Sequence, residues 1–393
     1  MNSDPIVILS ARRTPVGAFQ GVFAGVTAPQ LGTVAIKAAL ADSGVAASRV
    51  DEVIMGCVLS AGLGQAPARQ AALGAGLPSN VPATTVNKMC GSAMRAVMLA
   101  ADQILAGSAQ VIVAGGLESM TNAPYLLPKA RAGYRMGNQE VLDHMFYDGL
   151  QSPWDGTLMG CFAEATAEKY AFSRKDQDDF ATESVRRALA AIKKGDFAAE
   201  VAAVTAKTRK GEVLVDKDET PLTLDIAKIP TLKAAFKKDG TVTAASSASI
   251  SDGAAAVVLA RESFAATHGL KPLARILGYS SFARDPEWFT LAPVGAIQKL
   301  LAQVGWQAKD VDLYEINEAF AAVPMAAIRD LQLDHATVNV NGGACALGHP
   351  IGATGARILT TLLYALRARG KKHGIACLCI GGGEATAIAV ELV

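Results

Sequence analysis

The clearest helical pattern in this sequence lies over residues 91–106, where apolar side chains recur every three or four positions. That spacing places them on one face of a helix, and the glycine that follows, Gly107, is a common helix terminator. We therefore expect a helix over 91–106 that buries one face. The apolar positions are Met94, Val97, Met98, Ala101, Ile104 and Leu105.

Two distant stretches of the chain share one pattern. Residues 35–53 and residues 296–313 each contain a helical run, a glycine, a short polar stretch and an apolar strand-like stretch. They align at a constant offset of 261 residues, since Asp312 corresponds to Asp51 (312 − 51). Self-similarity at a fixed offset indicates one folding unit used twice.

The similarity continues along both regions. In each, a β-branched, strand-like stretch leads through a glycine-bearing turn into a helix, and then into an apolar strand that ends in glycines. Strands that alternate with helices favour an α/β fold with largely parallel pairing, here as two packed halves of like topology. The successive elements are 83–87, 91–106 and 111–116 in the first region, and 336–339, about 352–368 and 377–383 in the second.

Between the two regions lies a stretch, from about 120 to 245, that repeats nothing. It begins with an irregular part, continues with a part of helical composition over 164–194, and ends in a polar part. An insertion of this length commonly forms a lid or a binding element. The alternative is a surface elaboration without a function of its own.

Composition and charge narrow the class of protein. The chain has 393 residues, of which 51% are hydrophobic and 19% charged, and its formal net charge is +1. This length allows two or three domains, and a nearly neutral chain offers no basic field for nucleic acid or an anionic membrane. We find neither a signal-peptide pattern nor the roughly 18 apolar residues that a membrane-spanning helix needs. We expect no nucleic-acid or membrane partner.

The cysteines argue for a reducing, cytoplasmic setting. The chain contains no CxxC pair and no cysteine framework of the kind that staples small secreted domains. Cys377 and Cys379 are close, but no cluster of His or Cys nearby would complete a zinc site, so we predict no metal. The six cysteines are at positions 57, 90, 161, 345, 377 and 379.

Cys90 is a candidate nucleophile, because a strand precedes it and a helix begins just after it. A thiol at a helix N-terminus lies at the positive end of the helix dipole, so its pKa should fall. Gly91 allows a substrate to approach the backbone, and the free N–H groups of the helix start can bind an oxyanion. The alternative is a buried structural cysteine.

His349 lies in a glycine-rich loop directly before Pro350. A residue before proline is restricted to extended conformations, so the imidazole is held in place, as suits a general base for a thiol. The alternative is a loop histidine on the surface. We interpret the other histidines as surface residues; they are His144, His268, His335 and His373.

Two further side chains end apolar strands. Cys379 shares a strand face with Cys377, but only Cys379 adjoins the glycines 381–383 and can reach a cleft. Asn317 follows the strand 311–316, at a position that typically faces a ligand in α/β sheets. The alternatives are an inert core thiol for Cys379 and helix N-capping for Asn317.

Five short motifs in order along the chain resemble those of the thiolase family. Their order and spacing match over essentially the whole chain, which is far more specific than one motif. The resemblance implies an α/β fold of two similar βαβαβαββ halves, packed as a layered core, with a loop domain inserted in the first. The halves are then 1–120 plus 246–271, and 272–393, with the insertion at 121–245. The motifs are Cys90-Gly91-Ser92, Ser251-Asp252-Gly253-Ala254-Ala255-Ala256, Asn317-Glu318-Ala319-Phe320, Gly348-His349-Pro350-Ile351-Gly352 and Cys379-Ile380-Gly381-Gly382-Gly383.

The resemblance also implies roles. Cys90 is the residue that the substrate acylates, His349 is the base that activates it, and Cys379 moves the proton on the α-carbon of the second substrate. Asn317 holds a water beside His349 to form one oxyanion site, and the N–H groups of Cys90 and Gly381 form the other. The reaction is thiolysis of 3-ketoacyl-CoA, or the reverse Claisen condensation of two acetyl-CoA, with ping-pong kinetics. Coenzyme A is a substrate or product, and no cofactor is implied.

The family's insertion binds the pantetheine and nucleotide of the acyl-CoA substrate, and its members resembling this chain form homotetramers. By motif match, Met159, Phe236, Ala248, Ala319 and Phe320 line the substrate channel. Acetoacetyl-specific members often carry His immediately before the Met-Gly pair, whereas this chain has Leu158. Acyl-chain preference therefore stays open between an acetoacetyl-CoA enzyme and a broader degradative 3-ketoacyl-CoA thiolase. A non-catalytic acyl-CoA or lipid-binding protein, and a decarboxylating ketoacyl synthase, rank lower because Cys90, His349 and Cys379 are all present.

Overall fold

The two repeated regions form two stretches of sheet with the same strand order. The computed structural model describes residues 4–208 and 211–393. The N-terminal order is β4 (Ala83–Val86), β3 (Glu52–Gly56), β5 (Val111–Ser119), β10 (Ser251–Arg261) and β1 (Ile6–Arg13). The C-terminal order is β12 (Leu313–Ile316), β13 (His373–Ile380), β14 (Glu384–Leu392) and β11 (Ala274–Ala283). The place of β4 is taken by Val338, which pairs in parallel with Tyr314. The predicted duplication is confirmed.

The prediction of largely parallel pairing is wrong. The pairs β3–β4, β3–β5 and β12–β13 are parallel. The pairs β1–β10, β5–β10, β13–β14 and β11–β14 are antiparallel, as is the short β1–β11 contact that joins the halves. Only parallel neighbours need a crossover helix. β14 returns from β13 through a glycine turn and β10 enters from the insertion, so both run the other way.

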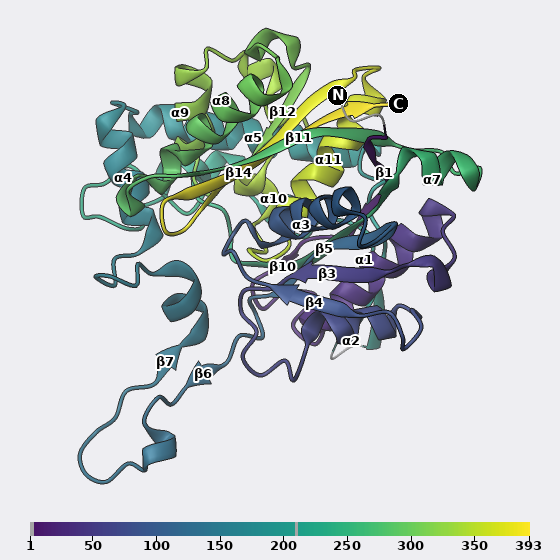
Figure 1. Ribbon diagram of the computed structural model, residues 1–393. Helices are drawn as coiled ribbons and strands as arrows, with labels where there is room; N and C mark the ends of the chain where they lie inside the picture. Colours follow the sequence, from purple (N-terminus) through teal and green to yellow (C-terminus); the bar gives the residue numbers. More distant parts are fainter. Residues whose placement is uncertain (1–3, 209–210) are drawn as a thin grey trace.

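Helices and sheets alternate in layers (Figure 1). Helices α1 (Ala28–Ser43) and α2 (Pro67–Gly74) cover the outer face of the N-terminal sheet. Helices α8 (Ala292–Val304) and α9 (Ala322–Asp330) cover the outer face of the C-terminal sheet. Between the sheets lie α3 (Ser92–Ala106) and α11 (Thr354–Ala368), whose apolar side chains form one shared core cluster.

The two central helices begin one or two residues later than the sequence predicts. Each predicted start is glycine, and Gly91 serves as the N-cap of α3. The helices pack closely, because a Cβ added at Gly355 would lie 2.4 Å from the backbone nitrogen of Met94. Glycine therefore lets the two halves approach to backbone contact.

The predicted helical part of the insertion, 164–194, forms parts of two helices instead of one continuous stretch. α4 (Met159–Lys169) and α5 (Arg174–Lys194) are separated because Ala171 has a left-handed φ of 50° and Ser173 caps α5. Strands β6 (Tyr125–Leu126) and β7 (Leu142–Asp143) form an arm that extends away from the body (Figure 1). The predicted boundaries of the insertion stay a proposal. The remaining short elements are β2 (Gly17–Ala18), β8 (Val204–Thr208), β9 (Gly211–Val215), α6 (Thr220–Thr223), α7 (Glu262–Thr267) and α10 (Ala344–Leu347).

Within the described ranges, none of the helices combines the length and apolar character needed to cross a membrane.

Candidate active site

Cys90 lies in a tight turn between β4 and α3. The Ser92 hydroxyl accepts a hydrogen bond from the Lys88 N–H at 2.8 Å and donates one to the Met89 carbonyl at 2.6 Å. Met89 has a left-handed φ of 48°, a strained conformation for a side chain of this size. Strand β4, the strained turn and the start of α3 together fix the position of the Cys90 thiol.

The loop after β13 meets this turn from the opposite half. The backbone N–H of Gly381 lies near enough to the thiol of Cys90 to lower its pKa, and Cys379 lies close enough for the two thiols to interact electrostatically. Gly91 packs so closely on Ile380 that an added Cβ would lie 2.4 Å from its Cδ1 atom. The structure thus brings together Cys90, Cys379 and Gly381, which the sequence singled out separately.

The pKa of each thiol is raised, so both are protonated in the resting protein, contrary to the prediction of a low pKa for Cys90. Burial raises the pKa of Cys90 to about 11, and the negative charge of Glu118 adds to it, although the N–H groups of Gly381 and Cys90 oppose the shift. Burial raises the pKa of Cys379 well above its ordinary value, and the neighbouring Cys90 raises it further. The cost of burying a charge exceeds the benefit of the helix start. A thiolate at either position therefore requires transfer of the thiol proton to another group.

His349 supplies a neutral imidazole. Its backbone N–H donates to the Ser249 carbonyl at 3.1 Å, and its Nδ1 lies 2.6 Å from the hydroxyl oxygen of Thr354. Its Nε2 is buried without a hydrogen-bond partner in the described part of the chain. Burial lowers the pKa of His349 to about 3, and the positive charge of Arg357 contributes. The residue is buried, so the surface alternative is excluded.

One of the other histidines departs from the surface prediction. His144 is buried, with its Nδ1 2.6 Å from a carboxylate oxygen of Asp148 and its Nε2 accepting from the Ala61 N–H at 3.4 Å. His144 has polar neighbours in the sequence, which suggested exposure. The adjacent Met145 packs in a small core cluster, however, and His144 is buried with it.

Asn317 does not cap a helix, because α9 begins at Ala322 with Ala321 as its N-cap. Its backbone N–H donates to the Cys377 carbonyl at 2.9 Å. Both polar atoms of its side chain are buried and have no protein partner within the residues described. Buried polar groups are nearly always hydrogen-bonded, so this amide and the Nε2 of His349 are positions for a water or a substrate oxygen.

Glu118, at the end of β5, is a site residue that the sequence reasoning missed. Its carboxylate accepts from the N–H groups of Val58 at 3.0 Å, Leu59 at 3.1 Å and Gly352 at 2.9 Å. It thereby ties the histidine loop of one half to the other half. Burial raises its pKa to about 7, although the three N–H donors oppose the shift. The sequence signal that could have identified Glu118 is a single carboxylate near the end of an otherwise apolar strand.

Four of the residues expected to line a substrate channel pack in one apolar cluster of the C-terminal half: Met159, Phe236, Ala319 and Phe320. Met159 lies against the loop after β13, since a Cβ at Gly381 would be 3.6 Å from its sulfur. Phe236 and Phe320 pack edge to face with ring centres 5.8 Å apart. The Ala248 N–H donates to the Ala319 carbonyl at 3.0 Å, which joins the serine-rich loop to the motif after β12. Leu158 pairs with Gln151 and is the N-cap of α4.

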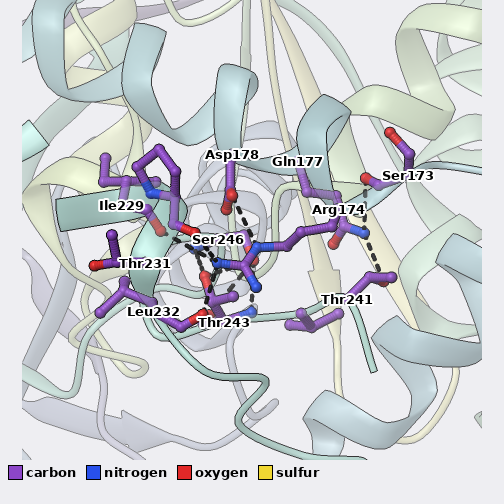
Figure 2. Close-up of polar contacts among 12 residues, drawn as sticks. Ser173, Arg174, Gln177, Asp178, Ile229, Thr231, Leu232, Thr241, Thr243 and Ser246 are labelled. Carbon is purple, nitrogen blue, oxygen red and sulfur yellow. Dashed lines mark hydrogen bonds and ion pairs between the residues drawn. The ribbon is translucent and has the colours of Figure 1, made fainter. Parts of the chain in front are cut away.

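Arg174 holds the segment that precedes Phe236 (Figure 2). Its guanidinium donates to the carbonyls of Ile229 at 3.2 Å and Leu232 at 2.7 Å, and pairs with Asp178 at 2.8 Å. A planar group with several fixed donors suits such a role. The segment around Ile229 and Leu232 is thereby tied to α5, another part of the insertion.

The protein-family model described as "Thiolase, N-terminal domain" matches residues 6–263, and the model described as "Thiolase, C-terminal domain" matches residues 270–392. The chain belongs to the thiolase family. It is 50% identical to an acetyl-CoA acetyltransferase of Pseudomonas aeruginosa over 385 residues, 98% of each chain. It is 51% identical to the Escherichia coli enzyme of that name over 387 residues, again 98% of each chain.

Two solved thiolase-fold structures are similar to the whole chain. The crystal structure of the Bacillus anthracis acetyl-CoA acetyltransferase has a TM-score of 0.97 and 42% identity, covering 99% of each chain. That of the Acat5 thiolase from Ascaris suum in complex with coenzyme A has a TM-score of 0.94 and 41% identity, covering 99% of this chain and 100% of that one. The thiolase fold expected from the motifs is confirmed.

Proposed function

We propose that this chain is a thiolase acyltransferase that exchanges acyl groups between coenzyme A thioesters through an acyl-Cys90 intermediate. The observation that carries the proposal is that two thiols from opposite halves lie close enough to interact, with the backbone N–H of Gly381 acting on Cys90. One thiol accepts an acyl group, and the second lies close enough to handle a proton beside it. The relatives named acetyl-CoA acetyltransferase support acetyl-CoA and acetoacetyl-CoA as the substrates.

In the first half-reaction, the sulfur of Cys90 attacks the thioester carbonyl carbon of the first acyl-CoA. Because the resting thiol is protonated, its proton passes to Nε2 of His349 as the carbon–sulfur bond forms. The N–H groups of Cys90 and Gly381 stabilise the resulting oxyanion. The coenzyme A sulfur then leaves and takes a proton from the Cys379 thiol, so the acyl-enzyme holds Cys379 as a thiolate and His349 protonated on Nε2.

In the second half-reaction, the Cys379 thiolate removes a proton from the α-carbon of a second acetyl-CoA. The enolate oxygen accepts hydrogen bonds from the Nε2–H of protonated His349 and from a water held by the Asn317 amide, the buried polar atoms that lack protein partners within the described residues. The α-carbon attacks the acyl carbon on Cys90, the carbon–sulfur bond breaks, and Cys90 recovers its proton from His349, which leaves both thiols protonated and His349 neutral. Thiolysis is the same sequence in reverse.

We also propose how coenzyme A enters, how the protein assembles, where it is located and which metabolism it serves. Coenzyme A enters as a substrate rather than as a bound cofactor, past Leu158, Met159 and the Phe236–Phe320 pair. The protein works as a homotetramer in the cytoplasm, and its chemistry serves fatty acid metabolism. Sedimentation of the purified protein at several concentrations tests the assembly.

Mass spectrometry after mixing with acetyl-CoA tests the mechanism. The wild-type protein should gain one acetyl group, which peptide mapping places on Cys90. Cys90→Ala should gain none. Cys379→Ala should be acetylated at Cys90 but turn over very slowly, while Cys377→Ala, a buried thiol two residues earlier on the same strand, serves as the matched control and should retain activity. Acetylation at another residue, or full activity of Cys379→Ala, would refute the assignment.

A further inference from the structure

Thr354, the first residue of α11, contacts the imidazole that the proposed function uses as its base. The Nδ1 atom of His349 and the hydroxyl oxygen of Thr354 are 2.6 Å apart, and both residues are buried. The same hydroxyl oxygen lies 2.9 Å from the Pro350 carbonyl. No motif of the sequence pointed to this threonine, because its spacing from His349 has meaning only once the loop is folded.

The hydrogens in this chain of three groups can be counted. A carbonyl only accepts, so the bond to Pro350 uses the single hydroxyl hydrogen of Thr354. The hydroxyl oxygen must then accept a hydrogen from Nδ1 of His349. A neutral imidazole has one N–H, so Nε2 is left with a lone pair and no hydrogen. That nitrogen is the one without a protein partner among the residues described.

We propose that Thr354 is a positioning residue that selects the Nδ1–H tautomer of His349 and so directs the basic nitrogen toward the substrates. The inference rests on the proposed function and deepens it, since it says which nitrogen exchanges protons with Cys90. Without the threonine oxygen, the two tautomers would have similar energies and the ring would lose its anchor. An imidazole with Nε2–H cannot take the thiol proton on that side.

The surroundings favour the neutral ring on which this count depends. Arg357 lies one turn farther along α11, and its positive charge and the burial of the ring both disfavour an imidazolium. Pro350 fixes the loop, and Gly352 is held by Glu118, so the carbonyl that receives the hydroxyl hydrogen does not move away. The tautomer is therefore selected by one hydroxyl on a rigid support.

Three variants test the role in turnover. Thr354→Val keeps the shape but removes the hydroxyl, and Thr354→Ser keeps the hydroxyl. Thr360→Val is the matched control, because Thr360 is buried on the same helix and its hydroxyl donates to the Ala356 carbonyl at 2.8 Å. We expect Thr354→Val to lower kcat and the rate of Cys90 acetylation about ten- to a hundredfold, part of the roughly 10²–10⁴ that a positioned base contributes. KM should change little, and Thr354→Ser and Thr360→Val should stay near wild type. Equal rates for Thr354→Val and Thr360→Val would overturn the proposal.

Neutron diffraction from the deuterated wild-type protein reads the tautomer without reference to activity. Deuterium on Nδ1 of His349 and none on Nε2 is the expected result. Deuterium on Nε2, with the Thr354 hydroxyl directed at Nδ1, would overturn the inference even if the enzyme is fully active. Failure of acetyl-CoA to acylate the wild-type protein would instead refute the proposed function and leave the tautomer measurement unaffected.

Discussion

A methyl group added at Gly91 tests whether contact between the two halves controls the chemistry. Gly91 lies between Cys90 and α3, and its α-carbon packs against Ile380, the residue after Cys379. Its φ of −83° and ψ of 1° are accessible to alanine, so Gly91→Ala introduces no backbone strain. The effect of the substitution is therefore a steric one, directed at the contact between the loops that carry the two thiols.

The size of the effect follows from the distances. The new Cβ would lie 2.4 Å from Cδ1 and 2.9 Å from Cγ1 of Ile380, whereas ordinary contacts begin at 3.4 Å. The loops must therefore separate by about 1 Å (3.4 − 2.4) unless Ile380 rotates. Overpacking of this kind costs about 1–3 kcal/mol of stability. A displacement of about 1 Å at reacting groups can lower the rate about a hundredfold.

A double-mutant cycle with Ile380→Val isolates the contact. Valine lacks Cδ1, the closest atom, so the next contact is the one at 2.9 Å and the required separation falls to about 0.5 Å (3.4 − 2.9). We expect kcat/KM for thiolysis to fall about tenfold to a hundredfold in Gly91→Ala and to recover in part in the double variant. The melting temperature should likewise fall in Gly91→Ala and recover in part in the double variant. Additive losses in kcat/KM would refute the steric explanation and indicate that the methyl blocks the substrate directly.

The remaining predictions concern the supports of the site. Arg174→Met removes the donors that hold Ile229 and Leu232, so KM for acyl-CoA should rise several-fold with little change in kcat. The control, Lys175→Met, loses only an exposed ion pair and should match wild type. Equal KM values for both variants would contradict the role of Arg174. Burial raises the pKa of Glu118 to about 7. Its contribution to the free energy of unfolding is therefore fully present below the ordinary pKa of 4.5 and is lost as the pH rises through 7. Folding should therefore weaken by about 3 kcal/mol between about pH 5 and pH 8 in wild type but not in Glu118→Gln, and parallel curves of melting temperature against pH would refute this.

The fold was largely accessible from the sequence because duplication leaves a repeated apolar pattern. The match of Asp51 with Asp312 identified corresponding elements, and these occupy equivalent places in the two sheets. Strand direction was not accessible in this way. It depends on how β10 returns from the insertion and how β14 turns back after Gly381, and a pattern of apolar residues does not record direction.

The site divides along similar lines. Cys90 and His349 stand next to glycine or proline, and Cys379 lies two residues before Gly381, so each has a local signal in the sequence. Thr354 and Glu118 act through contacts that exist only in three dimensions, so they were missed. The pKa of Cys90 was predicted in the wrong direction, because the sequence shows the helix start but not the burial that outweighs it.

The pairing of α3 with α11 has a consequence for how such a protein can exist at all. A single half on its own would expose to water the apolar surface of its central helix, around Met94 in one case and Leu362 in the other. Two separate copies would cover that surface only by associating, and would separate on dilution. Linking them in one chain makes the association intramolecular, so the shared interior and the pair of thiols above it persist at any protein concentration.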